Sequence, residues 1–359
     1  MKTYKNLHGK ICDIANIRNA YRKARKGKSS RGYVKKFDLK LDNNLMILKE
    51  ELESLTYEPR PMRTFVLKDP KTRVITAPHF RDRIVHHAIC NVLEPIFDRT
   101  FIHDSYACRK GKGTHSAIRR LDKFKRIASC NGRRTRRAKD SNMVTGFVLK
   151  CDIKQYFASI DHVILKSLFG KKIRDQGTMC LIDKILMCYH SDAHGKGIPI
   201  GSLTSQLFAN IYLDPLDYFV KHQLGAKYYV RYMDDFLIIH ESKGKLIEWK
   251  KEISCFLKTI KIELHEEKSR VFPLHNGVCF LGYRIFYHHK LLKKNAFRLL
   301  EKKLSNFRAT GDRNFIYCEK TRQTLESWLA YADFANTYKI RERMVETTGL
   351  TFGARPTGP

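Results

Sequence analysis

The sequence predicts an α+β fold in which strands alternate with helices and a helical segment follows. Three observations support this prediction. Residues 228–240 read as a buried strand-turn-strand, because β-branched and aromatic residues flank Asp234 and Asp235 on both sides. A second apolar run ends at Asp152, after which the pattern becomes helical. The last third, from Asn295 to Tyr338, is basic and rich in helical spacing.

The other elements follow from apolar spacing and from turn residues. In chain order we expect a helix over 43–56, a hairpin over 65–77 around Lys68-Asp69-Pro70-Lys71, a helix over 81–94 that ends at Pro95, and helices over 160–169, 179–189 and 205–221. A chain of 359 residues has room for two or three subdomains around one cleft.

The composition indicates a polyanionic partner. Lys and Arg total 69 against 36 Asp and Glu, which gives a formal charge of +33 and a pI near 9.8. Such an excess favours nucleic acid over a merely soluble basic protein, because it otherwise costs self-repulsion. Residues 1–36 hold twelve Lys or Arg against one acid, Asp13, and residues 123–139 hold eight. The second segment either grips template RNA or an accessory protein, or is a flexible, solvated loop.

Several classes of protein are disfavoured. The chain has no run of 18 apolar residues, and its first residues lack the apolar core of a signal peptide. Its ten cysteines include no Cys-x-x-Cys pair, so they indicate neither a zinc site nor a disulfide framework. We therefore expect no membrane partner and a cytoplasmic location.

The adjacent carboxylates of Asp234 and Asp235 suggest metal chemistry. Two acids in apolar surroundings repel each other unless a cation offsets them. A bare Asp-Asp pair is more often a solvated turn, but Asp152 on a neighbouring strand changes this interpretation. The three carboxylates could hold two Mg²⁺ ions about 3.5–4 Å apart, with Mn²⁺ as a substitute, for in-line phosphoryl transfer.

These residues form part of an ordered series of motifs that resembles the reverse transcriptases. The series comprises Phe80-Arg81-Asp82-Arg83, Asp152, Ile200-Gly201, Tyr232-Met233-Asp234-Asp235, Lys268 and Phe280-Leu281-Gly282-Tyr283. The resemblance implies a right-hand polymerase with fingers, a palm of antiparallel sheet plus helices, and a helical thumb. It also implies an RNA-directed DNA polymerase that uses template RNA, a primer or cDNA strand and deoxynucleoside triphosphates.

The motif order suggests the domain boundaries. We expect a basic N-terminal extension with the first fingers helices over 1–60, fingers over 61–145 with the basic insertion near 123–139, a palm over 146–285, a thumb over 286–345 and a flexible tail over 346–359.

The resemblance assigns roles to individual residues. Asp152, Asp234 and Asp235 are the palm carboxylates, with Asp152 and Asp234 as direct metal ligands beside Ile153, and Lys268 matches a lysine thought to protonate pyrophosphate. Phe157 matches a ring that excludes a 2′-hydroxyl. The nucleotide-binding set is Lys68, Arg73, Phe157, Ile200, Gly201 and Gln206. The template and primer set is Arg109, Lys110, Lys112, Tyr232, Met233, Phe280, Leu281, Gly282 and Tyr283.

Other roles remain open for several of these residues. Lys68 and Arg73 can be ordinary surface charges of a hairpin, Phe157 a core aromatic, and Lys268 a solvated lysine. The basic, Gly-containing loop around Arg109 is weak evidence for a phosphate contact.

The loop that begins at Ile200 suggests a subfamily. Ile200 stands where most relatives have Gln, and Gln206 where they have Pro, which resembles the enzymes of diversity-generating retroelements. That resemblance implies cDNA synthesis with errors at template adenines, mutagenic retrohoming, and a small basic oligomeric accessory protein. The alternatives are a retron, group II intron-like or antiphage defence reverse transcriptase, or a catalytically idle RNA-binding protein.

Overall fold

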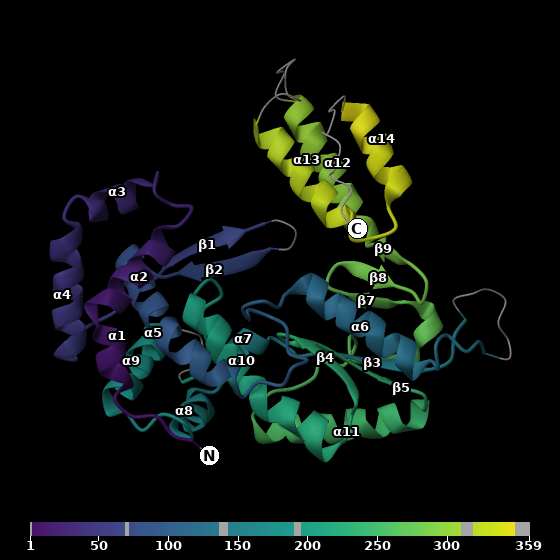
Figure 1. Ribbon diagram of the computed structural model, residues 1–359, viewed down its shortest axis with the longest axis horizontal. Helices are drawn as coiled ribbons and strands as arrows, with labels where there is room; N and C mark the ends of the chain where they lie inside the picture. Colours follow the sequence, from purple (N-terminus) through teal and green to yellow (C-terminus); the bar gives the residue numbers. More distant parts are fainter. Residues whose placement is uncertain (1, 69–71, 136–142, 190–194, 310–318, 349–359) are drawn as a thin grey trace. The chain divides into compact units, whose positions relative to one another are not determined.

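The computed structural model describes residues 2–68, 72–135, 143–189, 195–309 and 319–348, and Figure 1 shows its helices and strands. Helices accompany antiparallel sheets, so the α+β prediction is confirmed. The chain divides into two compact units. Unit 1 comprises Met1–Gly113, Leu149–Ile238 and Ile247–Arg270; unit 2 comprises Thr114–Val148, Ile239–Leu246 and Val271–Pro359.

Unit 1 begins with four helices, α1 (Leu7–Cys12), α2 (Ile14–Arg25), α3 (Gly32–Asp38) and α4 (Leu41–Glu53). The last matches the helix expected over 43–56. Helix α2 packs along α5 (Phe80–Asp98) and buries Ile17, Ala20 and Tyr21 at helical spacing. Most of its basic residues lie on the opposite, exposed side. The charged N-terminal segment is therefore the outer face of a folded helix layer.

A two-stranded hairpin follows, and the prediction over 65–77 is confirmed. Strand β1 (Arg63–Leu67) pairs antiparallel with β2 (Arg73–Ala77) from Arg63 opposite Ala77 to Leu67 opposite Arg73. The turn residues 69–71 lie outside the described residues.

The expected end of the next helix is wrong. Helix α5 does not stop before Pro95 but continues through it to Asp98. Pro95 lies in the last turn, where its missing N–H removes a single intrahelical hydrogen bond. The extra turn also buries Phe97, whose ring packs edge-on against Phe169 at 5.4 Å.

The central sheet has the strand order β4–β5–β3–β6, formed by β3 (Phe147–Asp152), β4 (Tyr228–Tyr232), β5 (Asp235–His240) and β6 (Arg270–Pro273). The strand ending at Asp152 and the hairpin around Asp234 are thus confirmed. The accompanying helices are α7 (Tyr156–Ser159), α8 (His162–Gly170), α9 (Gln176–Met187), α10 (Leu203–Tyr218) and α11 (Lys243–Thr259). The predicted helix over 205–221 changes at Phe219 into a π-helix, Phe219–Gln223.

Unit 2 holds α6 (Thr114–Ala128) and a three-stranded antiparallel sheet, β7 (Val278–Phe280), β8 (Tyr283–Ile285) and β9 (Lys290–Leu292). Helix α6 occupies the first part of the basic segment 123–139. Within it Lys125 is 1% exposed and bonded to Asp122, so this part is not a solvated loop. Residues 136–142 lie outside the described residues.

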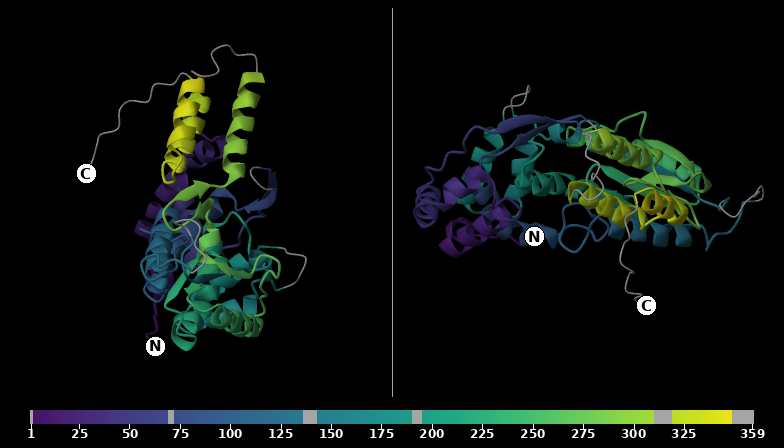
Figure 2. Two further views of the ribbon diagram at one scale, coloured as in Figure 1. Left: turned by 90° about the vertical axis from the view of Figure 1, so that its right-hand side faces the viewer. Right: turned by 90° about the horizontal axis from the view of Figure 1, so that it is seen from above.

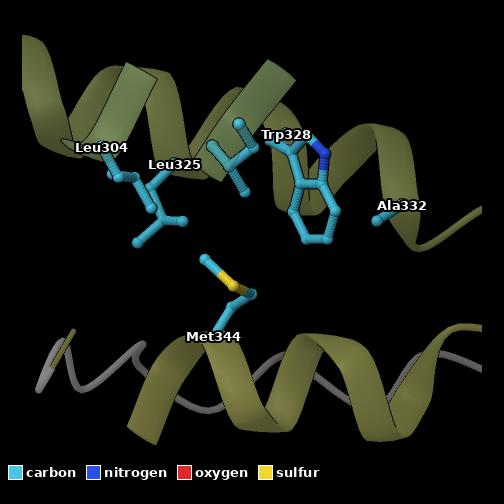
Figure 3. Close-up of a cluster of buried hydrophobic side chains, with 6 residues drawn as sticks. Leu304, Leu325, Trp328, Ala332 and Met344 are labelled. Carbon is cyan, nitrogen blue, oxygen red and sulfur yellow. The ribbon is translucent and has the colours of Figure 1, made fainter. Parts of the chain in front are cut away.

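Three helices complete unit 2 and confirm the helical prediction for the last third: α12 (Lys294–Ala309), α13 (Glu319–Ala332) and α14 (Tyr338–Thr348). They lie side by side in Figures 1 and 2. Figure 3 shows the apolar cluster that joins them, formed by Leu300, Leu304, Leu325, Trp328, Ala332 and Met344.

The expected tail begins inside α14, which runs to Thr348, and residues 349–359 lie outside the described residues. Among the helices that the structure describes, none has the length and apolar character needed to span a bilayer.

Candidate active site

The turn between β4 and β5 presents two carboxylates next to each other. Met233 has a φ of 58°, a left-handed conformation that is uncommon for a residue with a side chain. This conformation reverses the chain tightly, so that Asp234 lies in the turn and Asp235 begins β5. The acids are therefore fixed by a short, constrained turn.

Asp235 lies in surroundings that disfavour its charge. Its pKa is raised to about 6, chiefly by burial and also by the charges of Asp152 and Asp234, although Lys150 opposes the shift. The Nζ of Lys150 lies 3.0 Å from Oδ2 of Asp235. The other oxygen, Oδ1, is buried and has no hydrogen-bond partner among the described residues. An unpartnered buried carboxylate oxygen is a position that a cation would satisfy.

Asp234 connects the turn to three other predicted residues. Burial raises the pKa of Asp234, and the charge of Asp152 raises it further, while Arg73 and Lys268 lower it. Electrostatic interactions of this kind require proximity. The structure thus brings together Arg73 from β2, Asp152 from β3, Asp234 from the hairpin and Lys268 from the segment before β6.

Backbone and side-chain bonds hold Asp152 at the end of β3. His265 donates its backbone N–H to the carbonyl of Asp152 at 2.7 Å, and Ile153 forms an antiparallel bridge with Leu264. The Nζ of Lys268 lies 3.4 Å from Oδ1 of Asp152, and its side chain is 52% exposed. Lys268 therefore has room to leave the carboxylate.

The carboxylates do not form a complete metal cage. Across the described residues, no group of three or more His, Cys, Asp or Glu side chains is placed so that it could hold a metal ion. Ile153 is 2% exposed and has an apolar side chain, so only its backbone carbonyl could serve as a ligand. Mg²⁺ in nucleotide-processing sites is commonly held by one or two carboxylates together with substrate phosphates. The donor set fits that kind of site.

Lys150 was not predicted from the sequence, although a signal was present. Side chains alternate along a strand, so Lys150 and Asp152 share one face of β3. The strand's burial confirms this pattern, because residues 148, 149 and 151 are buried while 150 and 152 are partly exposed. A second missed residue is Arg231, a charged side chain in a buried strand that bonds to Asp217.

The loop at Ile200 is fixed against β2. Thr76 donates its backbone N–H to the carbonyl of Ile200 at 2.9 Å. Gly201 has a φ of 123°, and a Cβ there would lie 2.8 Å from Cγ2 of Ile75 and 3.2 Å from the carbonyl oxygen of Thr76. Only glycine fits this close approach. The side chain of Ile200 is left 38% exposed.

The structure places the other predicted nucleotide-binding residues less clearly beside the carboxylates. Phe157 is partly buried, and its carbonyl accepts from the backbone N–H of Ile198 at 2.9 Å. Gln206 is exposed on α10, and Lys68 is exposed at the end of β1, next to residues outside the described part.

In the basic loop 109–112, the side chains of Arg109 and Lys112 form hydrogen bonds within the protein. Arg109 bonds through Nε to Asp98 at 2.5 Å and through Nη1 to the carbonyls of Ile102 and Ser105 at 2.7 and 3.0 Å. Lys112 donates to the carbonyl of His103, whereas Lys110 is exposed. A strand that reached this loop would meet Lys110 more readily than Arg109.

Unit 2 contains the predicted primer turn. The side chains of Phe280 and Tyr283 are fully buried, so a nucleic acid would meet the backbone of the turn. Leu281 and Gly282 have φ angles of 47° and 92°. The hydroxyl of Tyr331 in α13 donates to the carbonyl of Gly282 at 3.1 Å, and that of Tyr283 donates to the carbonyl of Tyr331 at 2.9 Å. In unit 1, Tyr232 is partly buried at the end of β4.

Comparison with curated proteins gives distant relatives. The chain is 28% identical to protein YkfC of Escherichia coli, over 67% of this chain and 71% of that protein. It is 26% identical to the group II intron-encoded protein LtrA of Lactococcus lactis, over 66% of this chain. The match covers 48% of LtrA, so the chain spans about half the length of that relative.

Solved structures share the fold. An apo telomerase from Candida tropicalis aligns with a TM-score of 0.50 at 14% identity, over 81% of this chain and 59% of that chain. This supports the right-hand polymerase architecture and, at such low identity, nothing finer. The model of the reverse transcriptase (RNA-dependent DNA polymerase) family matches residues 66–285, more than half of the chain. With the carboxylate hairpin and the neighbouring Asp152, this match shows that the chain belongs to the reverse transcriptase family of RNA-dependent DNA polymerases.

Proposed function

We propose that this chain copies an RNA template into cDNA by two-metal nucleotidyl transfer at Asp152, Asp234 and Asp235. The observation that carries the proposal is the proximity of these three acids: burial raises the pKa values of Asp234 and Asp235, and the charge of Asp152 raises both further. A partly buried cluster of acids is costly unless cations neutralise it. The unpartnered Oδ1 of Asp235 supports the same conclusion.

Each residue has a role in this scheme. Asp152 and Asp234 would hold the Mg²⁺ ions directly, and Asp235, whose Oδ2 is bonded to Lys150, would offer them its unpartnered Oδ1. The bound ions would lower the pKa of the primer hydroxyl and stabilise the pyrophosphate that leaves. Arg73 and Lys68 bind the nucleotide's β- and γ-phosphates, where negative charge accumulates. Lys268 releases Asp152 and protonates the pyrophosphate.

Positions along the chain suggest the subdomains. Residues 1–60 form the N-terminal extension and first fingers helices, 61–145 the fingers, 146–285 the palm, 286–345 the thumb and 346–359 the tail. Phe157 selects deoxynucleotides. Lys110, with Arg109 and Lys112 behind it, contacts the template; Tyr232 and Met233 contact the primer, as does the turn from Phe280 to Tyr283.

We further propose that the enzyme serves a diversity-generating retroelement. The supporting observation is Ile200, which is partly exposed on a loop that Thr76 and Gly201 hold in place. Isoleucine offers shape but no hydrogen bond to the incoming nucleotide, and a lost polar contact of about 1 kcal/mol weakens discrimination. A small basic oligomeric accessory protein and a template RNA are the expected partners.

The second candidate is a group II intron-like enzyme, which the similarity to LtrA favours. Both candidates share the palm chemistry and differ in fidelity. For a retron or antiphage defence enzyme we expect the same fidelity as for the group II-like candidate.

The deciding experiment is primer extension on an RNA template with Mg²⁺ and all four deoxynucleotides, followed by sequencing of the products. Wild type is compared with Asp234→Asn, which removes one carboxylate charge, and with Ile200→Gln, which restores a polar group. We expect no extension by Asp234→Asn, errors concentrated opposite template adenines in wild type, and several-fold fewer such errors with Ile200→Gln.

Other results would change the assignment. Faithful extension by wild type would favour the group II-like candidate. Absence of extension, even with candidate accessory protein and structured template RNA, would leave a nucleic-acid-binding protein as the better description.

A further inference from the structure

A completely buried polar network lies behind the turn that presents Asp234 and Asp235. Arg231 of β4 and Asp217 of α10 are both 0% exposed. The guanidinium of Arg231 donates two hydrogen bonds to the carboxylate of Asp217, from Nε to Oδ1 at 2.7 Å and from Nη2 to Oδ2 at 2.6 Å. The hydroxyl of Tyr229 also donates to Oδ1, at 2.6 Å. Asp217 therefore holds the guanidinium in one orientation.

The remaining nitrogen of this guanidinium reaches the turn itself. Nη1 of Arg231 donates to the carbonyl of Met233 at 3.1 Å and to Oδ1 of Asn210 at 3.2 Å. Asn210 is anchored in turn, because its Nδ2 donates to the carbonyl of Ala107 at 2.9 Å. One side chain thus connects α10 to the carbonyl that immediately precedes Asp234.

That carbonyl belongs to the strained residue of the turn. The left-handed conformation of Met233 costs about 1–2 kcal/mol, so it persists only where surrounding contacts fix it. A donor on the Met233 carbonyl fixes the peptide plane between Met233 and Asp234. The direction in which Asp234 leaves the backbone depends on that plane.

Stability alone does not explain the network. A buried ion pair is often no more stabilising than apolar residues of similar size, because both ions lose their hydration. What a guanidinium offers is geometry: a rigid fork that can hold a carboxylate and a separate carbonyl at the same time. A lysine ammonium is a single point charge on a flexible stem and cannot hold both in fixed directions.

We propose that Arg231 is a positioning residue for nucleotidyl transfer, which fixes the Met233 carbonyl and so aims Asp234 and Asp235, with Asp217 and Asn210 holding Arg231 in place. The inference rests on the proposed function of the carboxylates. It assigns to Arg231 an effect on the rate of the chemical step and none on the binding of primer and template.

The test separates positioning from folding. In the neutral variant, Arg231→Met is combined with Asp217→Asn, so that no buried charge is left unpaired and Tyr229 keeps an acceptor. Arg231→Lys keeps the charge and loses the fork. Arg18→Lys is the control, because Arg18 of α2 pairs with Asp42 of α4 at 2.9 Å and these two helices hold no predicted site residue. Each protein is measured for Tm, for primer–template affinity by fluorescence anisotropy, and for the single-turnover rate of nucleotide addition.

We expect the neutral variant and Arg231→Lys to lose at least tenfold in single-turnover rate while primer–template affinity stays within about twofold of wild type, as for an effect realised in the transition state. Arg18→Lys should keep the wild-type rate. A folded neutral variant with an unchanged rate would overturn the inference. If the neutral variant does not fold, Arg231→Lys decides by the same criterion.

The result also distinguishes this inference from the proposed function. If wild type extends primers, Asp234→Asn does not, and the Arg231 variants match wild type, the inference alone fails. If wild type does not extend primers under any condition, the proposed function fails first.

Discussion

Two turns in this molecule contain left-handed residues and are held in place by side chains of different chemistry. The turn at Met233 in unit 1 and the turn at Leu281 and Gly282 in unit 2 both use left-handed residues. In each, a side chain outside the turn donates to a carbonyl of the turn, from the preceding strand β4 at Met233 and from α13 at Gly282. At Met233 the donor is the guanidinium of Arg231, and at Gly282 it is the hydroxyl of Tyr331.

The difference lies in charge and burial. Arg231 is fully buried and paired with a carboxylate, so removing either partner leaves a charge without compensation. Tyr331 is neutral and partly buried, and without its hydroxyl the Gly282 carbonyl still accepts from the backbone N–H of Lys293 at 3.1 Å. We call the Arg231–Asp217 pair at Met233 the charged clamp and the Tyr331 hydroxyl at Gly282 the neutral clamp. We infer that the charged clamp makes its turn rigid at a high energetic cost, whereas the neutral clamp leaves its turn adjustable.

The largest expected effect comes from breaking the charged clamp on one side. Asp217→Ala leaves Arg231 buried and unpaired, and we expect the free energy of unfolding to fall by about 3–5 kcal/mol. Urea denaturation followed by circular dichroism measures this loss. The exposed pair of Arg18 and Asp42, at 2.9 Å, provides the control: Asp42→Ala should cost less than about 1 kcal/mol. Similar losses in the two variants would remove the distinction between the clamps.

The neutral clamp is tested from the side of the glycine. In Gly282→Ala, the φ of 92° is strained for alanine, and the new Cβ overlaps the hydroxyl of Tyr331. We expect a loss of about 2–3 kcal/mol, because backbone strain and steric displacement add. Gly225→Ala isolates the backbone contribution, since φ there is 66° with open space around it, and should cost about 1 kcal/mol. Equal costs in thermal denaturation would show that Tyr331 moves aside freely.

A carboxyl beside the charged clamp gives a pH-dependent cost near neutral pH, where the tyrosines of the neutral clamp do not titrate because burial raises their pKa values. Burial, and then the charge of Asp217, raise the pKa of Asp214 to about 6. The folded state therefore binds this proton more tightly than the unfolded state, and wild type loses stability as pH rises from about 4 to above 6. We expect Asp214→Asn to be more stable than wild type by about 2 kcal/mol at pH 7.5, a difference that vanishes near pH 4. A difference in unfolding free energy that does not change with pH would contradict this origin.

The sequence was sufficient to predict the elements that carry the acids. An apolar run marked β3, β-branched and aromatic residues marked the β4–β5 hairpin, and the motif order placed Asp152 with Asp234. The resemblance also pointed to the turn from Phe280 to Tyr283, where the structure has left-handed residues at Leu281 and Gly282, and its contact with the primer stays a prediction. Pro95 misled the prediction, since a proline in the last turn of a helix loses only one hydrogen bond.

The clamps themselves could not be predicted, for a physical reason. Asp217 lies on a helix and Arg231 on a strand, so no local period relates them. Tyr331 and Gly282 are separated by 49 residues, and α13 had no motif to link it to the turn. A charged residue inside an apolar strand does indicate a buried partner, but it does not identify which acid supplies it. The three-residue strands β7 to β9 are likewise too short to show a period.

The smallest expected effect comes from removing the neutral donor alone. Tyr331→Phe keeps the ring, which lies 4.9 Å from that of Tyr283, and deletes only the hydroxyl. We expect a loss of about 1 kcal/mol in unfolding free energy, the ordinary net contribution of one hydrogen bond. If the turn at Gly282 contacts the primer, its greater freedom should also weaken primer–template affinity by a few-fold, which fluorescence anisotropy can measure, while the single-turnover rate at saturating primer–template stays near that of wild type. This pattern is the reverse of that expected for Arg231→Lys. A loss of rate without a loss of affinity would mean that both turns act on the chemical step and that the contrast between the clamps concerns stability only.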